Sequence, residues 1–278
     1  MDRFTQANRA AWNTWLARDV NSSHHQDVAR FERTGSSLRA IEVEELGAEV
    51  AGKSLLHLQC NMGSETLSWA RLGATVTGVD LADAAIVRAR ELAAATGLPA
   101  RFIQSDLYAL PATLDEAFDI VFMSYGILFW LADIPRWASI VARYVKPGGT
   151  FYIVDMHPFA NLFDHRRPEP TGLNFQVKYP YADAPVSAQP TAQSTNGATE
   201  QVDVADDDAP GGEYCWNHGL GEVVSALIAA GLRIEYLHEF PYQHYQQFPS
   251  LVRDDDGWWR WPTPENTMPL LFSLRATR

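Results

Sequence analysis

The segment Ser54–Asp80 contains a loop and a carboxylate that can bind the same ligand. The apolar run Leu55–Leu58 predicts a buried strand, and a short polar turn that ends at Gly63 follows it. Helical spacing over Glu65–Leu72 and a second apolar run that ends at Asp80 complete a strand–loop–helix–strand unit. Such a unit brings the acid beside the loop, where it can accept two ribose hydroxyls, so the segment predicts a site for an adenosine-type cofactor.

A histidine occupies the same kind of position farther along the chain. His157 comes just after the strand predicted over Phe151–Asp155. The carboxyl ends of strands in an open parallel sheet face the bound ligand, and a histidine there titrates near neutral pH. We therefore expect His157 to accept a proton in catalysis. The alternative is that it hydrogen-bonds the loop backbone.

The elements that must position these residues alternate between strands and helices. Strands separated by helices of ten or more residues predict a parallel, doubly wound α/β sheet of the Rossmann type. The predicted strands are Leu55–Leu58, Thr75–Val79, Arg101–Gln104, Phe118–Met123, Phe151–Asp155, Leu232–Phe240 and Met268–Thr277. The predicted helices are Glu65–Leu72, Ala82–Ala95, Pro135–Tyr144 and Gly219–Ala230.

Two segments depart from this alternation. Residues 1–50 read as a helical N-terminal cap, and residues 51–278 as the main domain. An insertion over about residues 160–215 is rich in proline and acid, and Tyr179–Leu232 contains no lysine or arginine. This composition predicts a loop or a partly disordered insertion. The connection between the last two strands is rich in tryptophan and tyrosine, so we expect it to be a folded loop.

The chain resembles the class I S-adenosylmethionine-dependent methyltransferases over about Ser36–Thr277, most strongly over Ser54–Pro158. In that family the first loop reads apolar–Asp–apolar–Gly–x–Gly–x–Gly. Here Leu56–Gly63 keeps only the last glycine, His57 replaces the acid, and two further glycines are replaced by Gln59 and Asn61. Asparagine tolerates a left-handed backbone better than most residues, which makes Asn61 a plausible substitute for glycine.

The resemblance implies S-adenosylmethionine as cofactor and a seven-stranded, mostly parallel sheet with an antiparallel C-terminal strand. It places Asp80 on the ribose and Asp106 with Leu107 near the adenine. The turn Lys146–Gly149 is a frequent family feature. The cofactor residues it implies are Gln59, Asn61, Gly63, Asp80, Asp106, Leu107 and Ser124. Tyr125, after the fourth strand, and Trp15, in the cap, are expected to line the substrate pocket.

Composition narrows the choice of substrate. The 278 residues carry a formal net charge of -12, which argues against nucleic acid because phosphate binding needs a basic surface. No apolar run is long enough to cross a membrane, and the start of the chain does not resemble a signal peptide. Neither the cysteines nor the histidines have metal-ligand spacing. We expect a cytoplasmic homo-oligomer without a metal.

These features favour methyl transfer to a small, fairly apolar acceptor, as in natural-product biosynthesis. Carbon, nitrogen and oxygen remain open as the acceptor atom. An alkene acceptor would leave a carbocation, and the many aromatic residues suit a cationic intermediate. Two alternatives also remain: a protein that binds the cofactor without transferring methyl, and a nicotinamide-dependent oxidoreductase. The oxidoreductase is disfavoured because the chain has no Gly-x-Gly-x-x-Gly.

Overall fold

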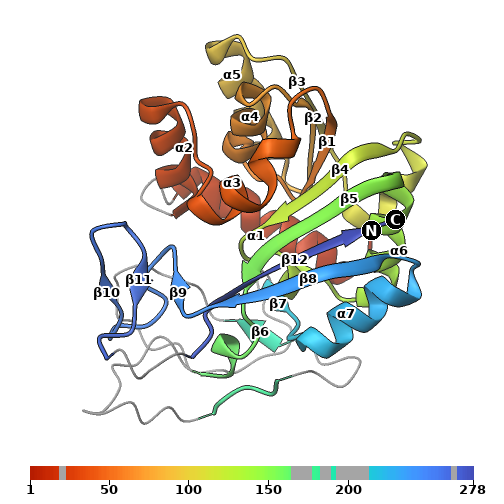
Figure 1. Ribbon diagram of the computed structural model, residues 1–278. Helices are drawn as coiled ribbons and strands as arrows, with labels where there is room; N and C mark the ends of the chain where they lie inside the picture. The colour runs from red at the N-terminus through yellow and green to blue at the C-terminus, as the bar shows by residue number, and fades with distance from the viewer. Residues whose placement is uncertain (19–22, 164–176, 182–188, 192–212, 264–267) are drawn as a thin grey trace.

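The computed structural model describes residues 1–18, 23–163, 177–181, 189–191, 213–263 and 268–278. Its centre is a seven-stranded sheet in the order β3-β2-β1-β4-β5-β12-β8 (Figure 1). The strands are β1 (Ser54–Leu58), β2 (Thr75–Asp80), β3 (Ala100–Gln104), β4 (Phe118–Ser124), β5 (Val145–Met156), β8 (Arg233–Phe240) and β12 (Leu271–Thr277).

The direction of the strands matches the prediction. Strands β1 to β5 pair in parallel, and β12 runs antiparallel to both β5 and β8. In the middle of the sheet, His57 of β1 lies level with Gly78 of β2 and Phe122 of β4. Because the strand order reverses on either side of β1, the loops after β1 and β4 diverge there and leave room for a ligand.

Helices cover both faces of the sheet because successive strand residues point to opposite sides. On one face Leu55 and Tyr152 share a buried cluster with Trp69 of α4, whereas on the other face Leu56 packs in a cluster with Trp137 of α6. The first face also carries α2 (Ser23–Thr34), α3 (Ala40–Leu46), α4 (Ser64–Arg71) and α5 (Asp83–Thr96). The second carries η2 (Leu107–Ala112), α6 (Ile134–Tyr144) and α7 (Leu220–Ala229).

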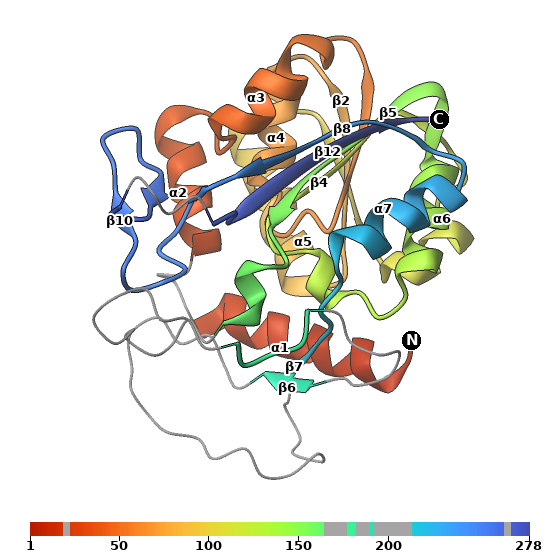
Figure 2. The same ribbon diagram turned by 60° about the horizontal axis from the view of Figure 1, so that its bottom comes forward.

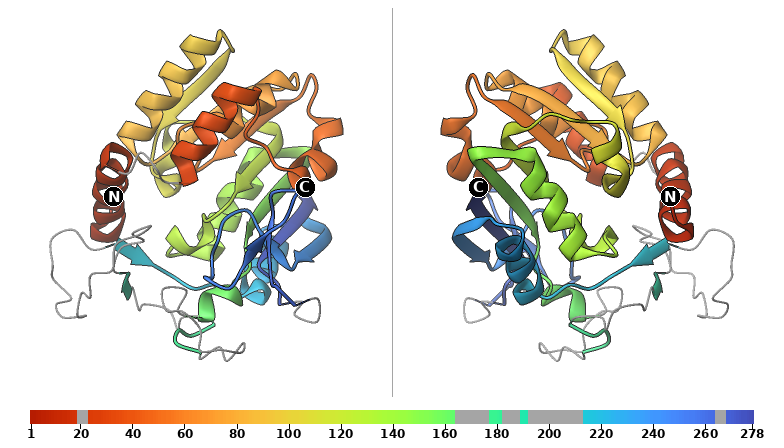
Figure 3. Two further views of the ribbon diagram at one scale, coloured as in Figure 1. Left: turned by 90° about the vertical axis from the view of Figure 1, so that its left-hand side faces the viewer. Right: turned by 90° about the vertical axis from the view of Figure 1, so that its right-hand side faces the viewer.

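The first helix, α1 (Arg3–Arg18), belongs to neither layer. It lies across the carboxyl-end side of the sheet, along the short pair β6 (Gln189–Thr191) and β7 (Glu213–Cys215) (Figure 2). The side views show α1 in red, with α5 in yellow above it and β7 in teal below (Figure 3). Arg9 forms an ion pair with Asp83 at the start of α5.

The helices predicted in residues 1–50 are present, and the division into a cap and a main domain stays a prediction. Whereas α1 lies over the carboxyl ends of the strands, Ile41 and Leu46 of α3 are part of the core beneath the sheet. The described part of the segment between β8 and β12, residues 241–263 and 268–270, is folded, as predicted. It forms a small antiparallel sheet of β9 (Tyr242–Gln243), β10 (Val252–Arg253) and β11 (Trp259–Arg260).

Most of the predicted acidic insertion lies outside the described residues, so the prediction of a disordered loop is not tested there. Within the described part of the chain, none of the helices combines the length and the apolar character that crossing a membrane requires.

Candidate functional site

A cleft opens where β1, β2, β3 and β4 end, and it encloses about 1350 Å³ including its open mouth. Of the predicted site residues, seven line it: Gln59, Asn61, Asp80, Asp106, Leu107, Ser124 and Tyr125. Gly63 ends the loop that forms its floor and caps α4. The topology therefore brings together residues that are separated by up to 66 positions in the sequence.

The loop after β1 has the backbone of a glycine-rich loop although it has lost two glycines. Gln59, Asn61 and Gly63 all have positive φ, at 57°, 49° and 76°. At Gly63 a Cβ atom would lie 2.7 Å from the ring of Phe102, so only glycine fits. Asn61 accepts a hydrogen bond from the amide of Met62 at 2.7 Å, which favours its local conformation.

Strained backbone is concentrated at this cleft. Among the described residues, the non-glycine residues with positive φ are Gln59, Asn61 and Tyr125, and all three line the cleft. Each such residue costs on the order of 1–3 kcal/mol and persists where the surrounding structure enforces it. Strain of this kind gathers at ligand sites, which supports a binding function for the cleft.

Asp80 fixes the loop and still faces the cleft. One carboxylate oxygen accepts the amide of Asn61 at 2.8 Å, and the other accepts the amide of Ala82 at 2.9 Å. Burial raises the pKa of Asp80, whereas these backbone hydrogen bonds lower it. Each oxygen has a second lone pair, so the carboxylate can also accept two hydroxyls. Asp106 is held by the amide of Tyr108 at 3.0 Å.

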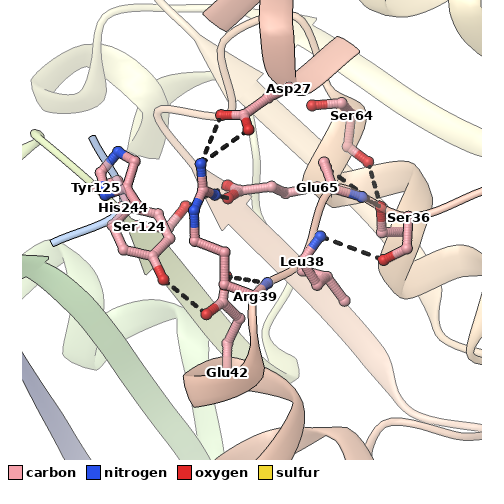
Figure 4. A network of polar contacts seen from close by, with 12 residues as sticks. Asp27, Ser36, Leu38, Arg39, Glu42, Ser64, Glu65, Ser124, Tyr125 and His244 are labelled. Carbon is pink, nitrogen blue, oxygen red and sulfur yellow. Dashed lines mark hydrogen bonds and ion pairs between the residues drawn. The ribbon is translucent and has the colours of Figure 1, made fainter. Parts of the chain in front are cut away.

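A buried charge network forms one side of the cleft (Figure 4). The guanidinium of Arg39 donates to both oxygens of Asp27, at 2.8 and 3.1 Å, and lies 3.6 Å from Glu65. It also stacks on the ring of Tyr125, whose hydroxyl donates to Glu42 at 2.7 Å. Burial opposes the charge of Arg39, but the surrounding carboxylates, Asp27 first, raise its pKa.

Behind this network a neutral histidine supports Ser124. His57 is buried, and desolvation lowers its pKa to about 3. Its Nδ1 atom lies 2.8 Å from the hydroxyl of Thr66, and its Nε2 atom lies 3.4 Å from the hydroxyl of Ser124. Ser124 donates in turn to Glu65 at 2.5 Å. His57 therefore acts indirectly, by orienting polar groups of the cleft.

Aromatic side chains form another part of the cleft wall, called the aromatic wall below. Trp12 of α1, Trp130 after β4 and Trp216 after β7 line the cleft. The ring of Trp12 lies edge-on to Trp130, with centroids 5.4 Å apart. Trp15, which was expected in the pocket, packs against both of these rings. Its ring centroid lies 5.3 Å from that of Trp12 and 6.2 Å from that of Trp130. It supports the wall and is not among the residues that line the cleft.

Sequence comparison assigns this architecture to a family. A family model described as a methyltransferase domain matches residues 56–153. A ubiquinone biosynthesis O-methyltransferase of Pseudomonas fluorescens (strain Pf0-1) is 33% identical over 165 residues, which cover 52% of this chain and 69% of the relative. The chain belongs to the class I S-adenosylmethionine-dependent methyltransferases. The predicted family, enzyme class and cofactor are thereby confirmed.

Another curated relative is matched over a shorter segment, and solved methyltransferases are matched over most of their length. A demethylmenaquinone methyltransferase of Thermus thermophilus is 34% identical over 116 residues, 41% of this chain and 52% of the relative. A solved methyltransferase from Mesorhizobium loti has a TM-score of 0.58 at 22% identity and covers 86% of this chain and 98% of its own. One from Methanosarcina mazei has a TM-score of 0.54 at 20% identity, with 87% and 98% covered. The solved structures show the fold.

The hydrogen-bonding groups in the cleft of the methyltransferase match those of S-adenosylmethionine. The side-chain oxygen of Gln59 is buried and has no hydrogen-bond partner among the described residues, while its amide nitrogen donates to the carbonyl of Ile127 at 3.4 Å. A buried acceptor of this kind needs a donor, and the ammonium of S-adenosylmethionine is one. Asp80 offers lone pairs to hydroxyls in the same cleft.

His157 is not among the residues that line this cleft. Its Nδ1 atom accepts the amide of Phe159 at 3.1 Å, and its Nε2 atom lies 2.7 Å from a carboxylate oxygen of Glu239. Burial lowers the pKa of His157, and Glu239 opposes that shift. Nδ1 is therefore engaged within the turn after β5 and Nε2 by Glu239 of β8, and the catalytic role stays an untested prediction.

Replacing His157 with alanine separates the two interpretations. Because both nitrogens hold the turn, we expect a lower melting temperature with methyl-transfer rate and cofactor affinity close to those of the wild type. Thermal melts and initial rates at several pH values measure this. A 100-fold fall in rate at unchanged cofactor affinity would instead show that His157 is the base.

Sequence reasoning missed several residues of the site. Asp27, Ser64 and Glu65 line the cleft, and Arg39 and Glu42 support it from behind. Asp27 and Arg39 are 12 positions apart and on separate elements, so no spacing rule joins them to the loop after β1. Glu65 carried a usable signal, because it is an acid just after the loop glycine at the start of a helix.

Proposed function

We propose that this enzyme transfers the methyl group of S-adenosylmethionine to a small, fairly apolar acceptor. The observation that carries the proposal is that one cleft is lined by a left-handed loop, by Asp80 and by three tryptophans. The loop and the acid suit the cofactor, and the aromatic wall suits an apolar body next to it. The cofactor supplies an electrophilic methyl group; the protein aligns the acceptor and excludes water.

Within the proposal, each part of the cofactor has its own residues. The ribose hydroxyls would bind to Asp80, and the adenine would lie near Asp106 and Leu107. The methionine part would lie over Gln59–Gly63, with its ammonium on the Gln59 oxygen. Ser124, at the end of β4, would border the methionine part. This arrangement leaves Tyr125 and the aromatic wall to the acceptor.

The charge of the cleft restricts the acceptor further. Its described lining includes the carboxyl groups of Asp2, Asp27, Glu65, Asp80 and Asp106 but no lysine or arginine. A negatively charged acceptor would therefore be repelled, whereas a neutral or cationic one would not. Tryptophan faces also attract cations, including a cationic intermediate on an alkene. We infer that acceptors with carboxylate or phosphate groups are poor substrates.

Relatives favour oxygen as the acceptor atom, because those at 33% identity are named as O-methyltransferases. Nitrogen and carbon remain alternatives that the same cleft can accommodate. A role in natural-product biosynthesis, a cytoplasmic location and a homo-oligomeric state belong to the proposal. The role follows from the elaborate covering of the cleft by α1 and the aromatic residues.

A panel of acceptors with one common ring tests this proposal. We expect methyl from labelled S-adenosylmethionine to reach catechol, benzylamine or styrene at least 10-fold faster than benzoate or phenyl phosphate. Scintillation counting and mass spectrometry of the products measure the rates and identify the methylated atom. Faster transfer to benzoate or phenyl phosphate would refute the charge argument. Cofactor binding without transfer to any acceptor would favour a binding protein.

A further inference from the structure

The buried network at the cleft holds more carboxyl groups than it can neutralise. Arg39 is 8% exposed, and three acids surround its guanidinium: Asp27 from α2, Glu42 from α3 and Glu65 from α4. One cation balances one carboxylate, and burying further unbalanced charge is costly. The network therefore has a place for a proton on one of its acids.

The contacts indicate which acid takes the proton. Asp27 receives two hydrogen bonds from Arg39, and Glu42 accepts the hydroxyl of Tyr125 at 2.7 Å and the backbone amide of Arg39 at 3.1 Å. Glu65 has the 3.6 Å approach of Arg39 and one hydrogen bond, which Ser124 donates. Burial, and then the charge of Glu42, raise the pKa of Glu65 to about 8. Arg39 and Ser124 oppose that shift, and Asp27 adds to it.

A chain of hydrogen bonds ends at the same carboxyl group. The hydroxyl of Thr66 is hydrogen-bonded to Nδ1 of His57, and Nε2 of His57 is hydrogen-bonded to the hydroxyl of Ser124. Ser124 in turn donates to Glu65. Because desolvation keeps His57 neutral, Nε2 can carry its proton and donate toward Ser124. Every donor in the chain then points toward Glu65, which orients its carboxylate as an acceptor.

We propose that Glu65 is the catalytic proton acceptor of the methyl transfer, a role that rests on the function proposed above. Three other acids of the cleft are less suited to it. Asp80 and Asp106 are held by backbone amides on the proposed cofactor side, and both oxygens of Asp27 are bound to Arg39. Nearby Cys60 is buried, and burial raises the pKa of its thiol.

When the acceptor is a hydroxyl group, two bonds form and two bonds break in the methyl transfer. The acceptor oxygen forms a bond to the methyl carbon, and the carbon–sulfur bond breaks with its electron pair going to sulfur. The oxygen–hydrogen bond breaks with its electron pair staying on oxygen, and the proton moves to a carboxylate oxygen of Glu65. The proton then leaves to solvent through the open cleft.

The ionisation of Glu65 can be measured without any acceptor. With carboxyl-labelled glutamate, we expect the wild type to show one resonance that titrates near pH 8, and Glu65→Gln to lose it. Ser124→Ala removes a hydrogen bond to the charged form, so the same resonance should titrate at higher pH. Glu116→Gln, an exposed acid paired with Arg101, is the matched control and should leave the resonance unchanged.

Turnover then tests the catalytic role, with catechol or the fastest acceptor of the panel. Because the ionised form of Glu65 is the active one, kcat/KM of the wild type should rise with pH, with its midpoint near pH 8, and level off at higher pH. Glu65→Gln should lower the plateau by about 10²-fold or more and remove this rise. Ser124→Ala should shift the rise to higher pH, and Glu116→Gln should behave as the wild type.

Two results would overturn the assignment. One is a Glu65→Gln enzyme that keeps the wild-type plateau and pH profile. The other is a variant whose main defect is a loss of S-adenosylmethionine affinity by calorimetry, with kcat preserved, since Glu65 would then bind the cofactor. Failure of the wild type to methylate any acceptor would concern the proposed function instead, because the resonance near pH 8 can be observed without turnover.

Discussion

Replacing Asp80 with asparagine is expected to weaken S-adenosylmethionine binding by at least 100-fold. The carboxylate would lose charge-assisted hydrogen bonds to two ribose hydroxyls, worth about 1.5–3 kcal/mol each. An amide also cannot accept from both Asn61 and Ala82, as the carboxylate does now, because one of its ends is a donor. The loop that carries the methionine part would loosen as well. Calorimetry with the cofactor measures the loss.

Asp133→Asn is the matched control for this substitution. Asp133 caps α6 by accepting the amide of Arg136, and it is not among the residues that line the cleft. Asparagine caps helices about as well as aspartate, so both stability and cofactor affinity should stay close to the wild type. A folded Asp80→Asn protein with unchanged cofactor affinity would contradict the ribose assignment.

Removing α1, residues 1–18, is expected to abolish turnover while the sheet stays folded. The deleted residues include Trp12 of the aromatic wall and three further residues that line the cleft, Asp2, Thr5 and Asn8. It is anchored at its sides, through Arg9 to Asp83 and through Asn8 to the backbone of Tyr214. The two main core clusters contain no residue of α1, so its loss opens the acceptor site without removing them.

Initial rates, circular dichroism and light scattering test the deletion together. We expect a methyl-transfer rate below one hundredth of the wild-type rate and a thermal transition that stays cooperative. If α1 also contacts a neighbouring subunit, light scattering should show a change in the size of the assembly. Thr14→Ala is a suitable control, since Thr14 is exposed and its hydroxyl donates to the backbone carbonyl of Ala10 in the same helix. A deletion variant with full activity and unchanged size would show that α1 neither covers the site nor mediates assembly.

The sheet could be predicted from the sequence because its strands are short apolar runs with clear boundaries. Phe118–Ser124 and Thr75–Asp80 are bounded by polar turns, and the strand ends that carry Asp80 and Asp106 follow from those boundaries. Parallel strands have their carboxyl ends on one edge, so the cofactor side of the cleft was predictable as a set of strand ends.

Other features of the cleft were not predictable in the same way. The positive φ of Gln59 follows no residue preference and is enforced by the surrounding fold. Arg39, Asp27 and Glu65 come from separate elements and meet only through long-range packing. His157 follows the same strand-end rule as Asp80, yet it turns toward Glu239, because β8 places an acid beside it. The position of a residue at the end of a strand predicts the edge of the sheet on which it lies, but it does not predict where the side chain points.

Direct binding of the cofactor to the wild-type chain tests the central claim most simply. Calorimetry should show one S-adenosylmethionine site per chain and no binding of NAD⁺ under the same conditions, and Asp80→Asn should lose the site. Binding of NAD⁺, or a full S-adenosylmethionine signal in the Asp80 variant, would contradict the account of this cleft as the methyl-donor site.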